Sequence, residues 1–413
     1  MMRWLQIGFI FFFGLFTFGN TAVFPALVTA GNGGPCTVTN QSVTINGLET
    51  TIHYPTSNQC NTNLTAPYPA IAFAHGFSLF GFSNGREENS GNGAHLASYG
   101  YVVAIPTLPD EADPRAENLI EVIDYLETQT AVSNSFLFGK IDTTRFATAG
   151  YSLGGTTALM VAARDHRVRS VVALDPVYHT GGPGGGDPIW APETEASGIT
   201  VPVGILGAPA DTCNDQSDYA DLYPLLGSGH KASYEISGAS HCAFADPGNS
   251  FCSFTCIGND SGAETQLSQS YMTSWFNYYL HYQTDAYSAL FGSALESDVM
   301  NGTISPQINT APKQFTAAAS IESISLGWQA NSNPMVAGYN LYRRLNANSY
   351  PNTPYQQLPN QANYLDTAVS TDNVYYYELQ AVDPVGNLFQ RSIEVSSTPL
   401  LASNRIYLPI VVE

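Results

Sequence analysis

The residues best suited to chemistry form one short run, Gly150-Tyr151-Ser152-Leu153-Gly154-Gly155. An apolar run precedes it and an alanine-rich run follows it, so Ser152 is expected at a strand-to-helix turn. Glycines two positions before and two after the serine leave room for a tight backbone that exposes the hydroxyl. The N–H of Leu153 then begins a helix and points toward developing negative charge. The run predicts a serine nucleophile; a chance Gly/Ser turn is the alternative.

A serine nucleophile needs a base that takes its proton. Five histidines follow Ser152, at positions 166, 179, 230, 241 and 281. We favour His241 because it lies in a loop, Gly238-Ala239-Ser240-His241, just after an expected strand that ends at Ile236. The alternative is a loop histidine that packs against the nearby cysteines.

The acid that orients the base has two candidates, each after an expected parallel strand. Asp175 follows an unbroken apolar run and precedes a proline that fixes the turn. Asp211 ends the next strand, in a polar loop where it could be solvated or bind a cation. We favour Asp175 and keep Asp211 as the alternative acid.

The second donor of an oxyanion hole is expected in the loop after an early strand, at His75-Gly76-Phe77. The backbone N–H of Phe77 would join that of Leu153, and His75 is interpreted as structural because it precedes the nucleophile. The rings of Phe77, Phe80 and Phe82 are candidates for an apolar acyl-binding wall, with ordinary packing as the alternative. We also expect Tyr178 to contact the substrate.

Alternating strand-like and helix-like runs between residues 37 and 285 must position these groups, and they predict an α/β fold with a mostly parallel sheet. The expected strands cover residues 69–74, 101–105, 145–149, 170–174, 201–206 and 232–236. An amphipathic helix follows Asp113-Pro114, with Asp113 as its cap, and a last one carries Leu267, Tyr271, Trp275 and Tyr278. A glycine cluster, residues 181–186, lacks a phosphate-loop pattern and is expected to form a loop at the rim of a pocket.

The character of the chain changes after about residue 305, where short alternating strands at 323–328, 338–344 and 374–383 predict a small all-β sandwich. Residues 310–398 resemble a fibronectin type III domain, an immunoglobulin-like fold, through Trp328, the strand Gly-Tyr-Asn-Leu-Tyr-Arg and the strand Tyr-Tyr-Tyr-Glu-Leu-Gln-Ala-Val-Asp. Such a module is a spacer or a candidate for binding a surface or polymer. We therefore expect a catalytic domain at 31–305, a sandwich at 306–398 and an apolar tail at 399–413.

Composition points to an exported protein. The 413 residues carry a net charge of -20 and only 14 Lys and Arg, which argues against a nucleic-acid partner and against adhesion to anionic lipid. Met1-Met2-Arg3 and an apolar stretch to Phe18 predict a signal peptide over residues 1–30, cleaved after Ala30 or alternatively after Ala22. A membrane anchor is the alternative, but the stretch is short for a membrane span.

Six cysteines suit an oxidising compartment. Cys36 and Cys60 flank an early segment, and the other four, at 213, 242, 252 and 256, lie close together in the sequence. We expect disulfides within each group. Metal binding is disfavoured because no Cys-x-x-Cys or histidine pair at ligand spacing is present.

Residues 40–285 resemble an α/β-hydrolase of the group that contains chlorophyllases, platelet-activating-factor acetylhydrolase-like enzymes and cutinase-like polyester hydrolases. The matching pieces are His75-Gly76-Phe77, Gly150 to Gly155, Asp165 to Pro176, and Gly238 to His241. The resemblance to the first two classes places the acid at Asp175. The resemblance to polyester hydrolases places it at Asp211, and those enzymes tend to have Trp-His where this chain has Tyr178-His179. Because both aspartates are present, the subfamily stays open.

These expectations describe a secreted serine carboxylic-ester hydrolase that forms an acyl-enzyme on Ser152 and needs no metal or organic cofactor. The short segment 177–200 leaves no room for a large helical lid, which suits acyl esters or polymeric esters. A serine peptidase on the same fold is one alternative. A non-catalytic protein that binds surfaces through its sandwich is another.

Overall fold

The computed structural model describes residues 33–60, 63–77, 85–179, 189–190, 195–214, 218–246, 252, 256, 262–329, 331, 333–346 and 348–401. Several expectations fall outside these residues: the signal peptide, Phe80 and Phe82, the glycine cluster at 181–186 and most of the C-terminal tail.

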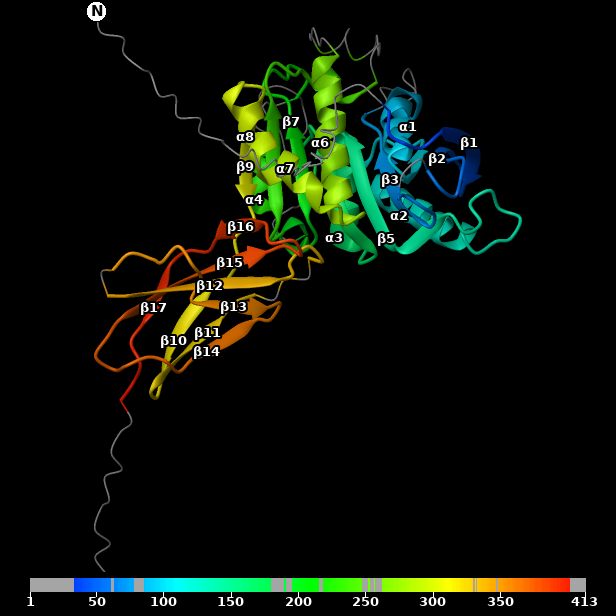
Figure 1. Ribbon diagram of the computed structural model, residues 1–413. Helices are drawn as coiled ribbons and strands as arrows, with labels where there is room; N and C mark the ends of the chain where they lie inside the picture. The colour runs from blue at the N-terminus through cyan, green and yellow to red at the C-terminus, as the bar shows by residue number, and fades with distance from the viewer. Residues whose placement is uncertain are drawn as a thin grey trace, which may run out of the picture.

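A nine-stranded sheet forms the centre of the first part of the chain (Figure 1). Its order is β1-β2-β4-β3-β5-β6-β7-β8-β9; the six strands from β4 to β8 in this order are parallel, and the outer pairings are antiparallel. All residues of β3 and β4 are buried, as expected for parallel strands covered on both faces. The bounds are β1 Val38–Ile45, β2 Leu48–Pro55, β3 Tyr68–Ala74, β4 Val102–Pro106, β5 Ile141–Tyr151, β6 Val168–Leu174, β7 Val203–Gly207, β8 Lys231–Ile236 and β9 Ile304–Asn309.

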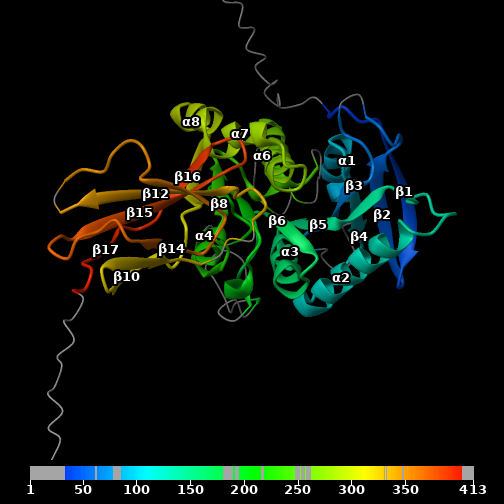
Figure 2. The ribbon, with the colours of Figure 1, turned by 60° about the horizontal axis from the view of Figure 1, so that its bottom comes forward.

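Helices cover both faces of this sheet (Figure 2). One hydrophobic cluster joins the sheet to α2 Ala112–Gln129, α3 Leu153–Arg164 and α4 Asp218–Leu225. A second cluster joins the other face to α1 Ser90–Ser98, α6 Ala263–Tyr279, α7 Tyr287–Phe291 and α8 Ser293–Met300. Short 3-10 turns are η2 Glu87–Asn89, η3 Ala196–Gly198, η4 His241–Phe244 and η5 Thr284–Ala286. The expected α/β fold is confirmed, and no helix among the described residues has the length and apolarity needed to cross a bilayer.

The expected cap of α2 is wrong. The helix begins at Ala112 after Glu111, so Asp113 lies inside the first turn and makes no cap hydrogen bond. Its carboxylate instead lies 2.8 Å from the Arg164 guanidinium on α3. A carboxylate in the first turn still suits the helix dipole, which explains why the residue type alone suggested a helix start.

Two antiparallel sheets follow the nine-stranded sheet along the chain, with Trp328 buried against Tyr339 and Phe315. The first sheet is β10 Thr316–Ser320, β11 Ser323–Gly327 and β14 Asn363–Asp366. The second is β13 Gln356–Pro359, β12 Gly338–Leu345, β15 Tyr375–Val382 and β16 Leu388–Arg391, with β17 Val395–Ser397 also paired to β15. The likeness to fibronectin type III stays a prediction.

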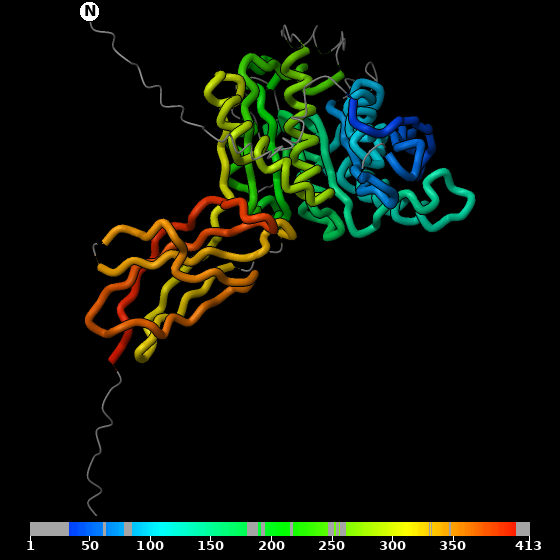
Figure 3. Tube along the Cα trace, in the orientation of Figure 1, coloured from blue at the N-terminus to red at the C-terminus, as the bar shows by residue number. Residues whose placement is uncertain are grey.

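The two parts lie against each other (Figures 1 and 3), and the side chains that meet at their junction are buried. The expected boundary at residue 305 falls inside β9, which pairs with β8 along its length. The ring of Phe389 packs edge-on against His230 at 4.7 Å between centroids, and Tyr278 donates a hydrogen bond to Asp383. His230 directly precedes β8, so the two antiparallel sheets lie at the end of the parallel strands opposite to their carboxyl ends.

Candidate active site

Ser152 lies at the sharp turn between β5 and α3, as expected. Its φ is 59° and its ψ is −127°, a conformation that non-glycine residues rarely adopt and that is held only when the surroundings impose it. A Cβ on Gly154 would come within 2.0 Å of the Ala74 carbonyl oxygen, and one on Gly150 within 2.1 Å of the Gly154 carbonyl oxygen. The glycines are therefore required by the close packing of the turn against β3.

His241 reaches this serine from the loop after β8. Its Nε2 lies 2.9 Å from Ser152 Oγ. Both residues are buried: His241 is 4% exposed and Ser152 is 6% exposed. The loop turns at η4, where Ser240 Oγ accepts a hydrogen bond from the Cys242 amide. Serine and histidine are 89 residues apart in sequence, and the parallel sheet brings them to one edge.

Two carboxylates reach the other nitrogen of this imidazole. Asp175 Oδ2 lies 2.7 Å from His241 Nδ1, and Asp211 Oδ2 lies 3.2 Å from the same atom. Both are almost fully buried, at 3% and 2% exposed. The expectation that Asp211 could be solvated is therefore wrong, because the loop after β7 folds inward over the histidine. The structure thus brings both candidate acids to His241.

Backbone N–H groups fix each carboxylate through its second oxygen. Asp175, at φ 41°, accepts a hydrogen bond from the Ala208 amide at 3.0 Å. Asp211 Oδ1 accepts from the amides of Cys213 and Asn214, at 2.6 and 3.4 Å. In both cases the anchored oxygen leaves Oδ2 to face the histidine.

Burial and neighbouring charge shift the pKa values of the three groups in different directions. Burial raises the pKa of Asp175, and the nearby charge of Asp211 adds to the rise. Burial acts the same way on Asp211, but hydrogen bonding to His241, its charge and the two amides lower the pKa of Asp211 below its ordinary value. Burial alone would lower the pKa of His241; the two carboxylates outweigh it and raise that pKa.

The loop after β3 lies directly against Ser152. A Cβ on Gly76 would be 3.2 Å from Ser152 Cβ, so the following N–H, that of Phe77, begins beside the serine. His75 is buried and accepts a hydrogen bond from the Leu108 amide at Nε2, leaving Nδ1–H to donate to the Gly76 carbonyl. This pattern fits the interpretation of His75 as a structural residue, and burial lowers its pKa to about 3.

Arg115 on α2 anchors the same loop through hydrogen bonds. The sequence analysis did not predict this role. Its side chain is fully buried, and its guanidinium donates to the carbonyls of His75 and Pro109 and, at 3.2 Å, to Thr157 Oγ1 on α3. A buried cation is rare unless its donors are used in this way. Its only signal in the sequence is an arginine among apolar positions of a helix.

The residues expected to contact substrate lie differently from one another. Phe77 is 48% exposed beside the serine, which suits an acyl-binding surface. Tyr178 is 8% exposed and belongs to the same hydrophobic cluster as Trp190. Phe80 lies outside the described residues. Substrate contact by these side chains stays a prediction.

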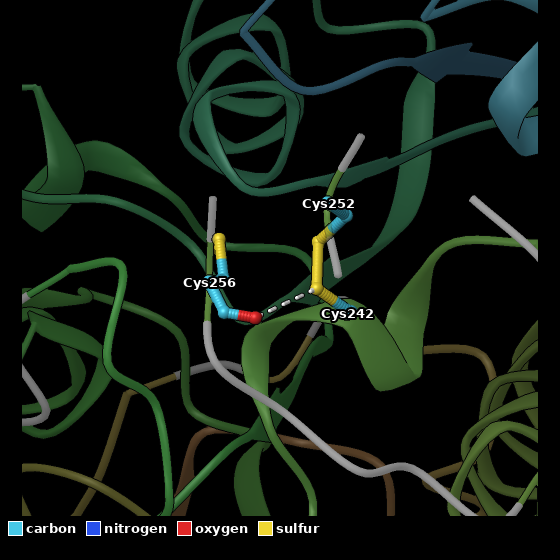
Figure 4. A group of neighbouring side chains, drawn as sticks. All are labelled: Cys242, Cys252 and Cys256. Atoms are coloured by element: carbon cyan, nitrogen blue, oxygen red, sulfur yellow. Dashed lines mark hydrogen bonds between the residues drawn. A yellow bond between two sulfur atoms is a disulfide. The ribbon is translucent and has the colours of Figure 1, made fainter. Parts of the chain in front are cut away.

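Disulfides and one carboxylate fasten the loops that carry the site. Cys242, next to His241, is bonded to Cys252, while Cys213, two residues after Asp211, is bonded to Cys256 (Figure 4 shows the first of these bonds). Cys36 pairs with Cys60, so pairing within each group is confirmed.

Asp246 anchors the loop that carries His241 to the start of α1. Its carboxylate accepts hydrogen bonds from the Gly91 and Asn92 amides. Sequence analysis missed this contact because Gly91 and Asp246 are 155 residues apart.

Two sets of potential metal ligands occur among the described residues. Cys242, Cys252 and Cys256 are all in disulfides and cannot serve as thiolates. Asp175, Asp211 and His241 are already within hydrogen-bond distance of one another through Nδ1. The geometry therefore gives these groups a hydrogen-bonding role, and we assign no metal to them.

Comparison with known proteins is consistent with this arrangement. The family model described as PET hydrolase-like matches residues 22–280. Cutinase 1 of Thermobifida cellulosilytica is 30% identical over 200 residues, which cover 47% of this chain and 65% of that protein. A cutinase of Thermobifida fusca (strain YX) is 30% identical over 200 residues, 47% of this chain and 56% of that protein. A bis(hydroxyethyl) terephthalate hydrolase of Streptomyces coelicolor is 27% identical over 196 residues, 46% of this chain and 54% of that protein. The chain thus spans less than two thirds of the length of these relatives.

Proposed function

Because the chain belongs to the PET hydrolase-like family, we propose that it hydrolyses carboxylic esters, including polyester bonds, through an acyl-enzyme on Ser152. The observation that carries the proposal is the contact of 2.9 Å between Ser152 Oγ and His241 Nε2 at a strained strand-to-helix turn. Relatives named as cutinases and as a terephthalate-ester hydrolase support ester over peptide bonds.

The steps follow from the positions of the groups. Ser152 Oγ attacks the ester carbonyl while His241 Nε2 takes its proton, and Asp175 stabilises the imidazolium. The N–H groups of Phe77 and Leu153 hold the negative oxygen of the tetrahedral intermediate. His241 returns the proton to the leaving alkoxide, and the ester oxygen departs as an alcohol. Water then attacks the acyl-enzyme with the same base, which releases the acid and restores Ser152.

The substrate class and location are part of the same proposal. The exposed Phe77 beside Ser152 offers an apolar surface for an acyl or aromatic group. The N-terminal pattern of residues 1–30 and the three disulfides support export to an oxidising compartment. Binding of a surface or polymer by the sandwich is a separate prediction that the site does not require.

The test compares wild type with Ser152→Ala on p-nitrophenyl esters, bis(hydroxyethyl) terephthalate and a peptide substrate. The rate of ester hydrolysis by Ser152→Ala should be on the order of 10⁴-fold or more below that of wild type. The exposed Ser237, near the histidine loop, provides the control, since Ser237→Ala should retain full activity. Equal rates in wild type and Ser152→Ala, or peptide cleavage without ester cleavage, would refute the proposal.

A further inference from the structure

Two buried carboxylates facing one imidazole nitrogen are more than a single-acid triad requires. One acid is enough to hold the tautomer of a catalytic histidine and stabilise its cation. Here the second acid is equally buried and comes from the neighbouring strand end. A buried carboxylate is costly unless it is paired, so Asp211 is unexpected here unless it contributes to the site.

The two carboxylates have different properties at the shared atom. Asp175 makes the shorter contact to Nδ1, 2.7 Å against 3.2 Å. The pKa shifts favour the other carboxylate. The pKa of Asp175 is raised, so it holds its negative charge less readily, whereas the pKa of Asp211 is lowered. Asp175 is thus the better placed hydrogen-bond acceptor, and Asp211 is the group that keeps its negative charge more readily. Distance and charge therefore do not select the same acid.

We propose that Asp175 and Asp211 both position His241 and together stabilise its imidazolium, so that neither carboxylate is individually required for turnover. The proposal rests on the proposed serine-hydrolase function. When Nδ1–H donates to Asp175, the charge of Asp211 lies within 3.2 Å of the same nitrogen. When Asp175 is removed, Asp211 remains an acceptor 3.2 Å from the same nitrogen, and its anchoring amides, those of Cys213 and Asn214, do not involve Asp175.

Neighbouring groups fit this arrangement. The Asn214 amide nitrogen lies 3.0 Å from Nδ1 and 3.2 Å from Nε2 of His241, so the residue that anchors Asp211 through its backbone also contacts the imidazole through its side chain. The charges that raise the pKa of His241 are those of the two aspartates. The titratable ring of Tyr151 packs on the imidazole, with 4.9 Å between centroids. Burial and the charges of Glu235 and the two aspartates raise the pKa of Tyr219.

The test uses Asp175→Asn, Asp211→Asn and the double variant in the full chain. Asparagine keeps the oxygen that accepts the backbone N–H groups, so each loop should stay anchored. Each single variant should lose no more than about tenfold in kcat, and the double variant on the order of 10⁴-fold, with KM nearly constant. The proposal would be overturned if one single variant lost as much kcat as the double variant while the other single variant kept the kcat of wild type.

Two further measurements distinguish a role of the aspartates in positioning His241 from a loss of folding. They also distinguish it from a failure of the proposed function. The acidic limb of kcat/KM against pH should move to lower pH in each single variant, because removal of one negative charge lowers the pKa of His241; an unmoved limb in Asp211→Asn contradicts its role. Thermal denaturation checks that the double variant is folded. If Ser152→Ala stays active the proposed function fails, whereas an inactive Ser152→Ala with a single essential aspartate overturns only this inference.

Discussion

At the scale of residues, the proposed chemistry requires that His241 be unprotonated at Nε2 when Ser152 attacks the ester carbonyl. The carboxylates raise its pKa above the ordinary value, so the base becomes available only as the pH rises through that raised pKa. We therefore predict that kcat/KM of wild type increases with pH across neutrality and reaches its plateau on the alkaline side. A pH profile with a plateau already established below pH 6.5 would contradict the effect of the carboxylates.

Arg115 is the residue whose loss should most directly test the oxyanion loop. Arg115→Met keeps the helix but removes the donors to the carbonyls of His75 and Pro109. The Phe77 N–H would lose its fixed position, so kcat should fall on the order of 10²-fold with a smaller change in KM. Arg164→Met, which removes partly exposed ion pairs to Asp113 and Glu195, is the matched control and should leave kcat unchanged. A folded Arg115→Met variant with the kcat of wild type would show that the loop at His75-Gly76-Phe77 keeps its conformation without Arg115.

At the scale of elements, the loops after β7 and β8 carry Asp211 and His241, and each is closed by a disulfide. The Cys213–Cys256 bond spans 43 residues and the Cys36–Cys60 bond spans 24, far from the site. Constraining the unfolded chain should make each bond contribute about 2–4 kcal/mol to stability. Only the first bond lies beside a carboxylate of the site.

We predict that replacing Cys213 and Cys256 by serine lowers kcat most strongly in the Asp175→Asn background, where Asp211 is the remaining carboxylate. The parallel replacement of Cys36 and Cys60 should lower the melting temperature without a matching loss of kcat. Steady-state kinetics below both melting temperatures make the comparison. Equal kinetic losses for the two pairs would mean that the Cys213–Cys256 bond has only a general stabilising effect.

At the scale of the whole molecule, the two antiparallel sheets, β10 to β17, pack onto the part that carries the nine-stranded sheet, at the amino ends of its parallel strands. β8 is six residues long, roughly 20 Å, and separates the junction at His230 from the histidine loop. Aromatic rings from both parts meet there: Phe389 of β16 lies near His230, Tyr278, Tyr287 and Phe291. The junction is thus part of the core, and it adds no described side chain to the contacts of Ser152 or His241.

Phe389→Ala should therefore lower stability and spare catalysis. Phe389 is 3% exposed, and truncation of a buried phenylalanine costs about 3–5 kcal/mol. Leu388→Ala, on the same strand but 45% exposed, is the control and should change stability little. Urea unfolding and ester kinetics measure the two effects. A Phe389→Ala variant as stable as Leu388→Ala would show that the two parts are not energetically joined.

Five buried histidines other than His241 make the whole fold sensitive to acid. Burial lowers their pKa values to about 3 or 4, while the unfolded chain binds these protons near pH 6.5: His53, His75, His95, His230 and His281. Their contribution to stability is complete above pH 6.5 and is lost as the pH falls toward 4. Four buried groups with raised pKa values act in the opposite direction but are fewer: Asp175, Asp218, Asp246 and His241.

The expected result is a lower urea midpoint at pH 5 than at pH 7. His95→Gln can preserve the hydrogen bond to Thr273 while removing one titrating group, so its midpoint should depend less on pH than that of wild type. A wild-type midpoint that stays constant or rises between pH 7 and pH 5 would contradict the prediction.

Local patterns in the sequence predicted much of the fold and the main residues of the site. Apolar runs marked the parallel strands to within a few residues, and the glycines around Ser152 marked its turn, because both signals depend on neighbouring residues only. The order of Ser152, two aspartates and His241 along those strands was also visible. The same local signals misplaced the cap of α2, since a carboxylate in the first turn resembles a carboxylate at the cap.

Contacts between distant segments were decided by the tertiary structure alone. The burial of Asp211 and its approach to Nδ1 beside Asp175 depend on how the loops after β6, β7 and β8 fold over one sheet edge, and no local pattern encodes that distance. The same is true of Arg115 beneath the oxyanion loop and of Phe389 against His230. The sequence alone determined which residue types stand at the strand ends. Only packing of the sheet, helices and disulfide-bonded loops decided that both carboxylates meet one histidine.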